Sequence, residues 1–390
     1  MTRILAFARE AGGAAAIAPV LHELVAREPV LILAKDYAQS VFRAEGLPAV
    51  SFETFEPAAV EALSARYLAA RWPDVLFTSA SSLPALDMTD KYLWGWARQH
   101  HVPSVAVLDQ WQNYALRFSG PDPAERLQYL PDWIAAMDEH ARDGLVAAGI
   151  PADSIVVTGQ PAFDRLLHLR RADRPGAREH VRRAVGVRKE ARLVCFVAEA
   201  FAEHFGQTLG FTEQSVLRDL VSICDELVRT QRLNIHLAVK LHPQNDPAAF
   251  DWLTHLPLPS GMAATLHWDD PPAHPLVLAS DVVVGMSSIL LIESILLGLP
   301  TVSFQPNARE ETGLMATVIG AIPLLRTRDT CLTIVRELLT NPMVRAGYLK
   351  QQERVSTHGT AAKGVSDLLY RASGRTVSDG TDVLDTVIQR

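Results

Sequence analysis

The sequence is poor in cysteine and contains no long apolar run. Its three cysteines, Cys195, Cys224 and Cys331, lie far apart and form no Cys-x-x-Cys pair, which excludes a disulfide framework and a structural zinc site of that type. No stretch approaches the roughly 18 consecutive apolar residues that cross a bilayer. Residues 1–8 resemble a strand and lack the basic flank and cleavage site of a secretory signal. These absences predict a cytoplasmic protein.

An excess of charge is also missing. The chain has 37 Lys and Arg against 44 Asp and Glu, a formal net charge of −7. This balance argues against a nucleic-acid partner, because proteins that bind nucleic acids usually carry a basic face. The hydrophobic share of 48% excludes disorder as the main state. A chain of 390 residues exceeds the usual size of one hydrophobic core, so we expect two domains of roughly 150 to 200 residues each.

Short β-branched or apolar runs alternate with longer helical patterns, as is typical of βα units that build parallel sheets. The expected strands are 4–8, 30–34, 74–78, 104–108, 133–136 and 154–157 in the first half, and 192–197, 235–239, 264–267, 281–284 and 301–304 in the second. The expected helices include 92–100, 139–148, 214–229 and 289–297. The fold class is therefore α/β, with two Rossmann-like domains in tandem.

Changes in composition suggest the domain boundaries. We place the first Rossmann-like domain at residues 1–165 and an Arg-rich, polar linker or connecting helix at 166–190. The second Rossmann-like domain follows at 191–342. Helical patterns predict C-terminal helices at 343–372, and a loose tail rich in Asp, Thr and Gly occupies 373–390.

The most informative segment is 279–307, ASDVVVGMSSILLIESILLGLPTVSFQPN. A buried strand ends at Gly285, Ser287 and Ser288 follow, and an apolar helix begins. Anions collect at helix N-termini outside the carboxyl ends of parallel strands, so the two serines predict a phosphate site. Glu293 lies in apolar surroundings and needs a polar partner, for which a ribose diol is suitable. The alternatives are that the serines are ordinary N-caps and that Glu293 faces solvent.

A second loop follows the strand at 235–239 and carries Lys240, His242 and Pro243. Lys240 and a cationic His242 can neutralise a phosphate, or stabilise a leaving phosphate as its charge develops. A structural histidine bonded to a backbone carbonyl is the alternative. Because both loops follow strands of one domain, we expect them to lie at the same edge of the sheet.

These motifs carry a resemblance to a known family. KLHP at 240–243 together with the Ser287-Ser288 pair resembles the His-Pro and Ser-Ser motifs of bacterial GT-B transferases that use cytidine-nucleotide donors, including capsule polysialyltransferases. The helix with Glu293 and its LGLP turn is similar to the donor-nucleotide helix of the wider GT-B superfamily. That superfamily includes CDP-glycerol glycerophosphotransferases and non-hydrolysing UDP-N-acetylglucosamine 2-epimerases. The segment VTGQPAFDRL at 157–166 resembles the entry to their interdomain hinge.

The resemblance implies a GT-B fold in which two Rossmann-like domains face a central cleft and C-terminal helices cross back to the first domain. It implies an acceptor domain first and a nucleotide-donor domain second. His242, Ser287 and Ser288 would contact the donor phosphate, and Glu293 the ribose. The expected activity is that of a metal-independent, inverting glycosyltransferase, or of a related polyol-phosphate transferase, in surface polysaccharide or glycoconjugate biosynthesis.

The same resemblance defines the expected partners. No cofactor is expected, because the nucleotide-activated donor, of CMP, CDP or UDP type, is a substrate. The second substrate is a glycan or a small-molecule acceptor, and peripheral association with membrane-bound glycan assembly machinery is compatible with this role. The chain lacks the Asp-x-Asp pattern with which many glycosyltransferases hold a metal. Metal independence follows, because His, Lys and helix-end N–H groups can supply the positive field.

The chain also departs from the epimerases of this superfamily. They carry a Gly-Asp pair, a His-x-Glu-Asn motif and a Ser-Gly-Gly turn, where this chain has TSASS at 78–82, LDQW at 108–111 and GMSS at 285–288. The transferase is therefore the leading hypothesis. The alternatives are a nucleotide-sugar 2-epimerase or hydrolase on the same fold, and a non-catalytic GT-B-like binding protein.

The catalytic base is expected after a strand of the first domain. Asp109 follows the strand at 104–108 and opens the run DQWQNYALRF. Trp111 and Tyr114 of this run suit a sugar platform, or else cover the edge of the sheet. We rank Asp109 narrowly above Glu10 as the base.

Glu10 follows the first strand in a loop whose Gly12 and Gly13 let a ligand approach the backbone closely. Asp87 and Asp138 rank lower, and Asp138 has the pattern of an N-cap.

In the second half, Arg309 precedes Glu310 and Glu311 in a polar loop. Arg309 can help to hold a donor or acceptor anion. A solvated loop explains the same charges.

Overall fold

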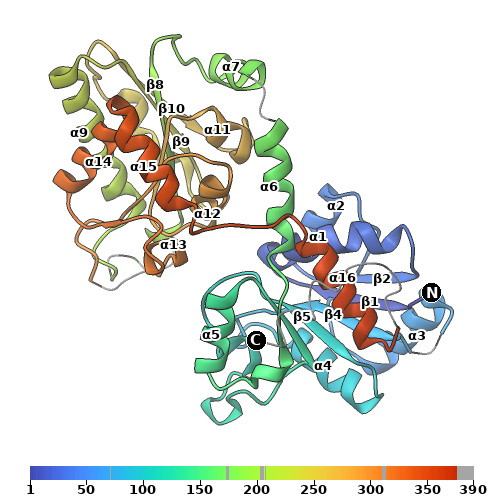
Figure 1. Ribbon diagram of the computed structural model, residues 1–390. Helices are drawn as coiled ribbons and strands as arrows, with labels where there is room; N and C mark the ends of the chain where they lie inside the picture. The colour runs from blue at the N-terminus through green and yellow to red at the C-terminus, as the bar shows by residue number, and fades with distance from the viewer. Residues whose placement is uncertain (71, 173–174, 203–205, 207, 310–312, 376–390) are drawn as a thin grey trace. The chain divides into compact units, whose positions relative to one another are not determined.

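The computed structural model describes residues 1–70, 72–172, 175–202, 206, 208–309 and 313–375. The chain divides into two compact units (Figure 1). Unit 1 comprises Met1–Asp164 and Thr357–Arg390, and unit 2 comprises Arg165–Ser356. The first division falls inside helix α6 (Pro161–Ala172).

Unit 1 is built on a seven-stranded parallel sheet with the strand order β3-β2-β1-β4-β5-β6-β7. The strands are β1 (Ile4–Ala8), β2 (Val30–Ala34), β3 (Ala49–Ser51), β4 (Val75–Ser79), β5 (Ser104–Val107), β6 (Trp133–Ala136) and β7 (Ile155–Val157). Every residue of β1, β4 and β5 is buried. Such continuous apolar strands are expected where helices cover both faces of a parallel sheet.

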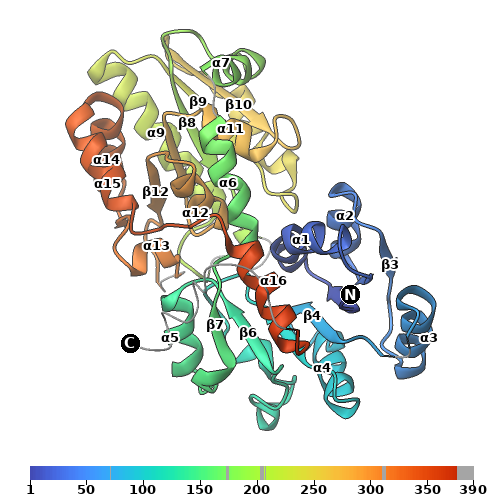
Figure 2. The same ribbon diagram turned by 45° about the vertical axis from the view of Figure 1, so that its right-hand side comes forward.

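The last helix of the chain completes the core of unit 1. The helices of this unit are α1 (Ala11–Val25), α2 (Tyr37–Ala44), α3 (Pro57–Leu68), α4 (Thr89–Gln99), α5 (Glu139–Ala147) and α16 (Ala361–Ala372), with 3-10 turns η1 (Leu116–Phe118), η2 (Pro123–Glu125) and η3 (Ala152–Ser154). Helix α16 packs against α1, β4 and β5 (Figure 2). It buries Val365, Leu368 and Leu369 in the core that contains Ile17 and Val105. The expected return of a C-terminal helix to the first domain is confirmed for α16.

Unit 2 is built on a six-stranded parallel sheet with the order β10-β9-β8-β11-β12-β13. Its strands are β8 (Arg192–Val197), β9 (Ile235–Lys240), β10 (Met262–His267), β11 (Val282–Gly285), β12 (Thr301–Phe304) and β13 (Leu324–Leu325). Its helices, besides most of α6, are α7 (Pro175–Ala184), α9 (Glu213–Gln231), α10 (Trp252–His255), α11 (Ala273–Ala279), α12 (Ile289–Leu296), α13 (Met315–Val318), α14 (Arg328–Thr340) and α15 (Pro342–Gln352), with the 3-10 turn η4 (Pro247–Phe250). Both units therefore have the expected α/β architecture.

The expected strands agree with the observed ones to within two residues, but two edge strands escape the sequence pattern. These are β3 and β13, of three and two residues. Runs this short carry no measurable periodicity. They are strands only because they pair with a neighbouring strand, and this pairing is set by the tertiary structure.

Several expected boundaries are adjusted by the structure. The segment expected as a linker or connecting helix, 166–190, contains most of α6 and all of α7. The C-terminal helices expected at 343–372 are divided, because α15 belongs to unit 2 and α16 to unit 1. From residue 376 onward, the expected tail lies outside the described residues, as do Glu310 and Glu311. Within the described ranges, no helix combines the length and the apolar character needed to span a membrane.

The packing of α16 predicts that Leu369→Ala destabilises unit 1. Leu369 is fully buried, so its truncation should lower the free energy of unfolding by about 2–5 kcal/mol. The control is Lys363→Ala on the same helix, whose side chain is 68% exposed and whose loss should change stability by less than about 0.5 kcal/mol. Urea denaturation measures both variants, and equal effects would contradict the role of α16 in the core.

Candidate functional site

Each sheet reverses its strand order at one point. In unit 1, β1 lies between β2 and β4, and in unit 2, β8 lies between β9 and β11. Chain connections leave two such neighbouring strands in opposite directions, and ligands of open α/β sheets commonly bind outside the carboxyl ends of such strands. The loops that follow β1 and β4, and those that follow β8 and β11, are therefore the first candidates for a site in each unit.

In unit 2, Glu199 and Ser287 join the two loops at the reversal point. The Glu199 carboxylate, which follows β8, accepts hydrogen bonds from the Ser287 N–H (2.8 Å) and from the Ser287 hydroxyl (3.2 Å). Ser288 is the N-cap of α12, and its hydroxyl accepts a hydrogen bond from the Leu290 N–H at 3.2 Å. The N-cap alternative is thus confirmed for Ser288. Ser287 binds an internal carboxylate at the helix end where the sequence predicts a phosphate.

The environment of Glu199 makes it an acid that titrates near neutral pH. Burial raises the pKa of Glu199 to about 7, although hydrogen bonds from residues 286–288 favour its charged form. A carboxyl group with such a pKa can both accept and donate a proton under physiological conditions. The sequence patterns described above do not single out Glu199, although an acid two residues after the buried strand β8 is a usable signal.

Asn245 connects the loop after β9 with the loop after β8. Its buried side chain accepts a hydrogen bond from the His242 N–H (2.9 Å) and donates one to the backbone carbonyl of Glu199 (3.2 Å). The Nδ1 atom of His242 accepts a hydrogen bond from the Gln244 N–H at 3.2 Å. The structure therefore brings the His242-Pro243 loop and the Ser287 loop to the same edge of the sheet.

Two of the predicted ligand residues are engaged by other elements of unit 2. The Oε2 atom of Glu293 lies 2.7 Å from Nε2 of His274 on α11. The Lys240 ammonium group donates to the backbone carbonyls of Trp268 and Pro271, and burial lowers the pKa of Lys240. Lys240 therefore fastens the loop that follows β10. The polar partner that Glu293 needs is supplied by a histidine of the chain itself.

The remaining predicted residues of unit 2 are Gly285 and Arg309. A Cβ atom at Gly285 would lie 3.2 Å from the carbonyl oxygen of Val197, so glycine suits the close packing at the end of β11. Arg309 is exposed, and its N–H donates to the carbonyl of Leu209 at 3.0 Å. A ligand role for Arg309 stays a prediction.

In unit 1, Asp109 is part of a buried ion pair at the carboxyl edge of the sheet. Its Oδ1 atom lies 2.7 Å from Nη1 of Arg117, and the two side chains are 7% and 2% exposed. The start of α1 approaches Asp109 from the other side, where a Cβ atom at Gly12 would lie 2.9 Å from Oδ2. A Cβ atom at Gly13 would lie 2.6 Å from the Cβ of Ser79. Both glycines therefore allow α1 to begin against the ends of β4 and β5.

Glu10 lies at the reversal point of unit 1, where its Oε1 atom accepts a hydrogen bond of 2.6 Å from the Ser81 hydroxyl. Burial raises the pKa of Glu10, the Ser81 hydrogen bond opposes this, and the charge of Asp109 adds to the rise. The Arg9 guanidinium, 3.8 Å away, favours the charged form. The structure thus places the two leading candidates for the base, Asp109 and Glu10, close enough to interact electrostatically.

The two lower-ranked acids have structural roles. Asp138 caps α5 by accepting the Ala141 N–H (2.7 Å), and it also accepts the indole N–H of Trp111 (2.8 Å). Asp87 forms an ion pair with Lys35. Across the described part of the chain, no group of three or more His, Cys, Asp or Glu side chains is placed to hold a metal ion.

The aromatic residues after β5, Trp111 and Tyr114, pack against other residues of unit 1. Trp111 stacks on Phe163 with the ring centroids 6.1 Å apart. The Tyr114 ring lies over Gly144 of α5, where a Cβ atom would approach Cε2 to 2.3 Å. These contacts favour the alternative that the two rings cover an edge of the fold.

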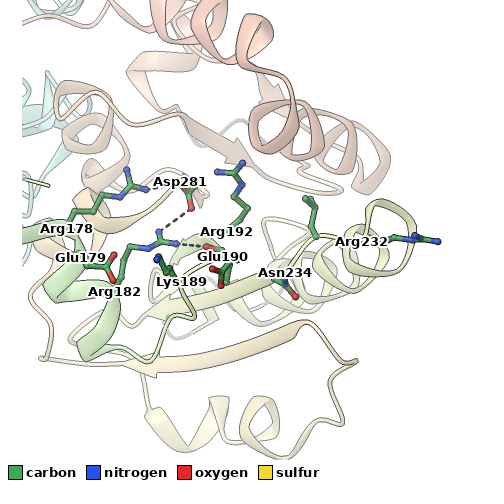
Figure 3. Close-up of a pocket in the computed structure, with 11 residues that line it drawn as sticks. Arg178, Glu179, Arg182, Lys189, Glu190, Arg192, Arg232, Asn234 and Asp281 are labelled. Carbon is green, nitrogen blue, oxygen red and sulfur yellow. Dashed lines mark hydrogen bonds and ion pairs between the residues drawn. The ribbon is translucent and has the colours of Figure 1, made fainter. Parts of the chain in front are cut away.

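A separate cavity of about 600 Å³ lies at the amino edge of the unit 2 sheet. Two of its arginines, both on α7, fasten that helix to this edge. Arg178 and Arg182 reach Asp281 at 2.7 and 3.3 Å (Figure 3). Asp281 also accepts the Leu193 N–H at 2.7 Å, while Arg232 points away from the others (Figure 3). The cavity is thus a structural junction on the side opposite the candidate residues.

Comparisons with known proteins identify the fold. No protein-family model matches the sequence, and no curated protein is significantly similar to it. Among solved structures, the UDP-GlcNAc 2-epimerase of Neisseria meningitidis bound to UDP-GlcNAc has a TM-score of 0.65 and 16% identity, over 95% of this chain and 100% of that chain. The UDP-GlcNAc 2-epimerase of Methanocaldococcus jannaschii has a TM-score of 0.63 and 14% identity, over 94% and 99%. HepE of Anabaena in complex with UDP and glucose has a TM-score of 0.62 and 13% identity, over 95% and 100%.

These likenesses confirm the expected GT-B-like fold of two parallel α/β sheets with flanking helices. At such low identity they establish the fold alone. They also correct the functional hypothesis, because UDP-GlcNAc 2-epimerases head the matches. The prediction of a glycosyltransferase or polyol-phosphate transferase is therefore wrong, and the alternative of a nucleotide-sugar epimerase is better supported.

The raised pKa of Glu199 predicts that unit 2 loses stability as the pH rises. The folded protein holds this proton more tightly than the unfolded chain, whose pKa is near the ordinary 4.5. The free energy of unfolding should therefore fall between about pH 4.5 and pH 7, by at most about 3 kcal/mol.

The Glu199→Gln variant should lose this part of the pH dependence and be more stable than wild type at pH 8. Urea midpoints at pH 5 and pH 8 measure the effect. Glu190→Gln, which removes an exposed carboxylate of the same unit, should keep the wild-type dependence. If Glu199→Gln and wild type lose stability equally with rising pH, the pH dependence of stability does not come from the proton on Glu199.

Proposed function

We propose that the protein acts on a nucleotide-activated sugar and inverts the configuration at C2 of a UDP-N-acetylhexosamine. The observation that carries this proposal is the pair of interacting carboxyl groups, Glu10 and Asp109, at the carboxyl edge of unit 1. The epimerases among the structural neighbours support the class of reaction.

Inversion at C2 breaks the C2–H bond on one face of the sugar and re-forms it on the other. The electron pair of the C2–H bond forms a C1=C2 double bond as the C1–O bond breaks and UDP leaves, and re-addition of UDP restores the C1–O bond when the proton returns. Two groups that transfer protons are therefore needed, and carboxyl groups in different surroundings can take the two roles. The raised pKa of Glu10 suits the group that holds a proton. Asp109, which is ion-paired with Arg117, suits the partner that accepts one.

We assign nucleotide binding to the carboxyl edge of unit 2. The diphosphate takes the N–H groups at the start of α12 that are now bonded to Glu199, with the Ser287 hydroxyl and His242 beside them. Because one set of donors cannot serve two negative charges, diphosphate binding is expected to be accompanied by protonation or displacement of Glu199. The titration of Glu199 near neutral pH makes this exchange accessible.

The test is incubation with UDP-N-acetylglucosamine in deuterated water without any acceptor. We expect its C2 epimer to form and deuterium to appear at C2, both followed by proton NMR. Glu10→Gln and Asp109→Asn should each lower kcat/KM by about 10²–10⁴-fold, because each removes a proton-transfer group. Glu190→Gln is the control and should keep wild-type kinetics.

Other outcomes contradict the proposal. Release of UDP with the sugar configuration unchanged would identify a hydrolase. Nucleotide binding without turnover, measured by calorimetry, would identify a binding protein. Wild-type rates in both Glu10→Gln and Asp109→Asn would remove the two carboxyl groups from the mechanism.

A further inference from the structure

An ion pair on α4 is buried in unit 1 and is not explained by the proposed chemistry. Lys91 is completely buried, and Asp90 is 2% exposed. The Lys91 ammonium lies 3.2 Å from Oδ1 of Asp90, and the Lys91 N–H donates to the same oxygen at 2.9 Å. Removing two charges from water is costly, and an apolar pair of similar volume is often as stable. The remaining hydrogen bonds of this pair therefore indicate what it does.

Those remaining hydrogen bonds go to a single residue, Ser81. The second oxygen of Asp90 accepts the Ser81 N–H at 2.8 Å. The Lys91 ammonium donates to the Ser81 carbonyl at 3.2 Å. Both backbone polar groups of Ser81 are therefore held by ionisable side chains that are themselves buried. The loop after β4 is fixed at this residue.

The fixed backbone determines the direction of the Ser81 hydroxyl group. Its Oγ atom accepts the Leu83 N–H at 3.3 Å and lies 2.6 Å from Oε1 of Glu10. With an N–H donor already directed at the oxygen, the hydroxyl proton is available for the Glu10 carboxylate. A continuous path of hydrogen bonds therefore runs from the buried pair through Ser81 to Glu10.

We propose that Asp90 and Lys91 are positioning residues for Glu10, which act by clamping Ser81 so that its hydroxyl donates to the Glu10 carboxylate. The proposal rests on the proposed function only in taking Glu10 as a proton-transfer group. Neither residue of the pair contacts Glu10 in the hydrogen bonds given above. Their effect on the reaction is transmitted by the placement of one hydroxyl group.

The consequence is a defined change in the proton affinity of Glu10. The charged groups that face Glu10 are Arg9 from its own loop, and Asp109 and Arg117 from the loop after β5. Against burial, which raises the pKa of Glu10, the Ser81 hydrogen bond lowers it. Loss or misplacement of this hydroxyl should therefore raise the pKa of Glu10 further.

The experiment is a titration of the Glu10 side-chain carboxyl in the full-length protein, followed by carbon-13 NMR with labelled glutamate. The resonance is assigned by its absence in Glu10→Gln. Ser81→Ala should move the midpoint upward by about half a pH unit or more. The double variant Asp90→Leu/Lys91→Met removes both hydrogen bonds to Ser81 and should move the midpoint in the same direction. Because it removes both charges together, it leaves no unpaired charge in the core.

Trp94→Phe is the matched control. Trp94 is buried on the same helix, donates to the Thr78 hydroxyl at 2.9 Å, and has its ring 5.8 Å from the Lys91 ammonium. Phenylalanine keeps an aromatic ring at this position, so the change removes a buried hydrogen bond without removing a contact of Ser81. Its Glu10 midpoint should equal that of wild type. In the active protein, the limb of the pH–kcat profile that reports Glu10 should shift with the NMR midpoint in each variant, while KM stays within about twofold.

The outcomes separate this inference from the proposed function. If Ser81→Ala shifts the midpoint and the double variant does not, the clamp is overturned. If Trp94→Phe shifts it as much as the double variant, general loosening of α4 explains the effect and the inference also fails. Absence of turnover in the wild-type protein contradicts the proposed function, but the NMR titration still tests the clamp.

Discussion

The reversal of strand order at β1/β4 and at β8/β11 is the constraint on which both candidate sites depend. At such a point the connections leave in opposite directions, so the loops that follow the two neighbouring strands face each other at the carboxyl edge of the sheet. In each unit, a glutamate after the first strand is hydrogen-bonded to a serine after the fourth. Glu10 accepts from Ser81 in unit 1, and Glu199 accepts from Ser287 in unit 2. Both glutamates have a raised pKa because burial disfavours their charged forms.

The two glutamates differ in their neighbours, and this difference separates their roles. Glu199 faces the N–H groups at the start of α12, which stabilise its negative charge. A phosphate could bind the same N–H groups in its place. Glu10 faces a second carboxyl group, Asp109, whose charge adds to the effect of burial. The surroundings of Glu199 thus suit the exchange of its carboxylate for a bound phosphate. The surroundings of Glu10 suit the transfer of a proton.

Two buried ion pairs hold the loops around Glu10 in unit 1. Asp90 and Lys91 hold both backbone groups of Ser81. Arg117, besides its pairing with Asp109, donates to the backbone carbonyls of Ala80 and Gln112. Backbone groups in loops have no strand or helix to pair with and must be satisfied by side chains or water. Buried charges are weak evidence for stability, but here they determine where functional side chains point.

The sequence by itself determined the α/β class, most strands and helices, and the loops on which Glu10, Asp109, His242 and Ser287 lie. These follow from local periodicity and from the rule that ligands collect at the carboxyl ends of parallel strands. Partners distant along the chain were decided only by the tertiary structure. Glu199 lies 88 residues from Ser287, and Ser81 lies 71 residues from Glu10. His274 is the hydrogen-bond partner of the Glu293 carboxylate. Strand order brings these side chains within hydrogen-bonding distance, and a local pattern carries no information about which strands become neighbours.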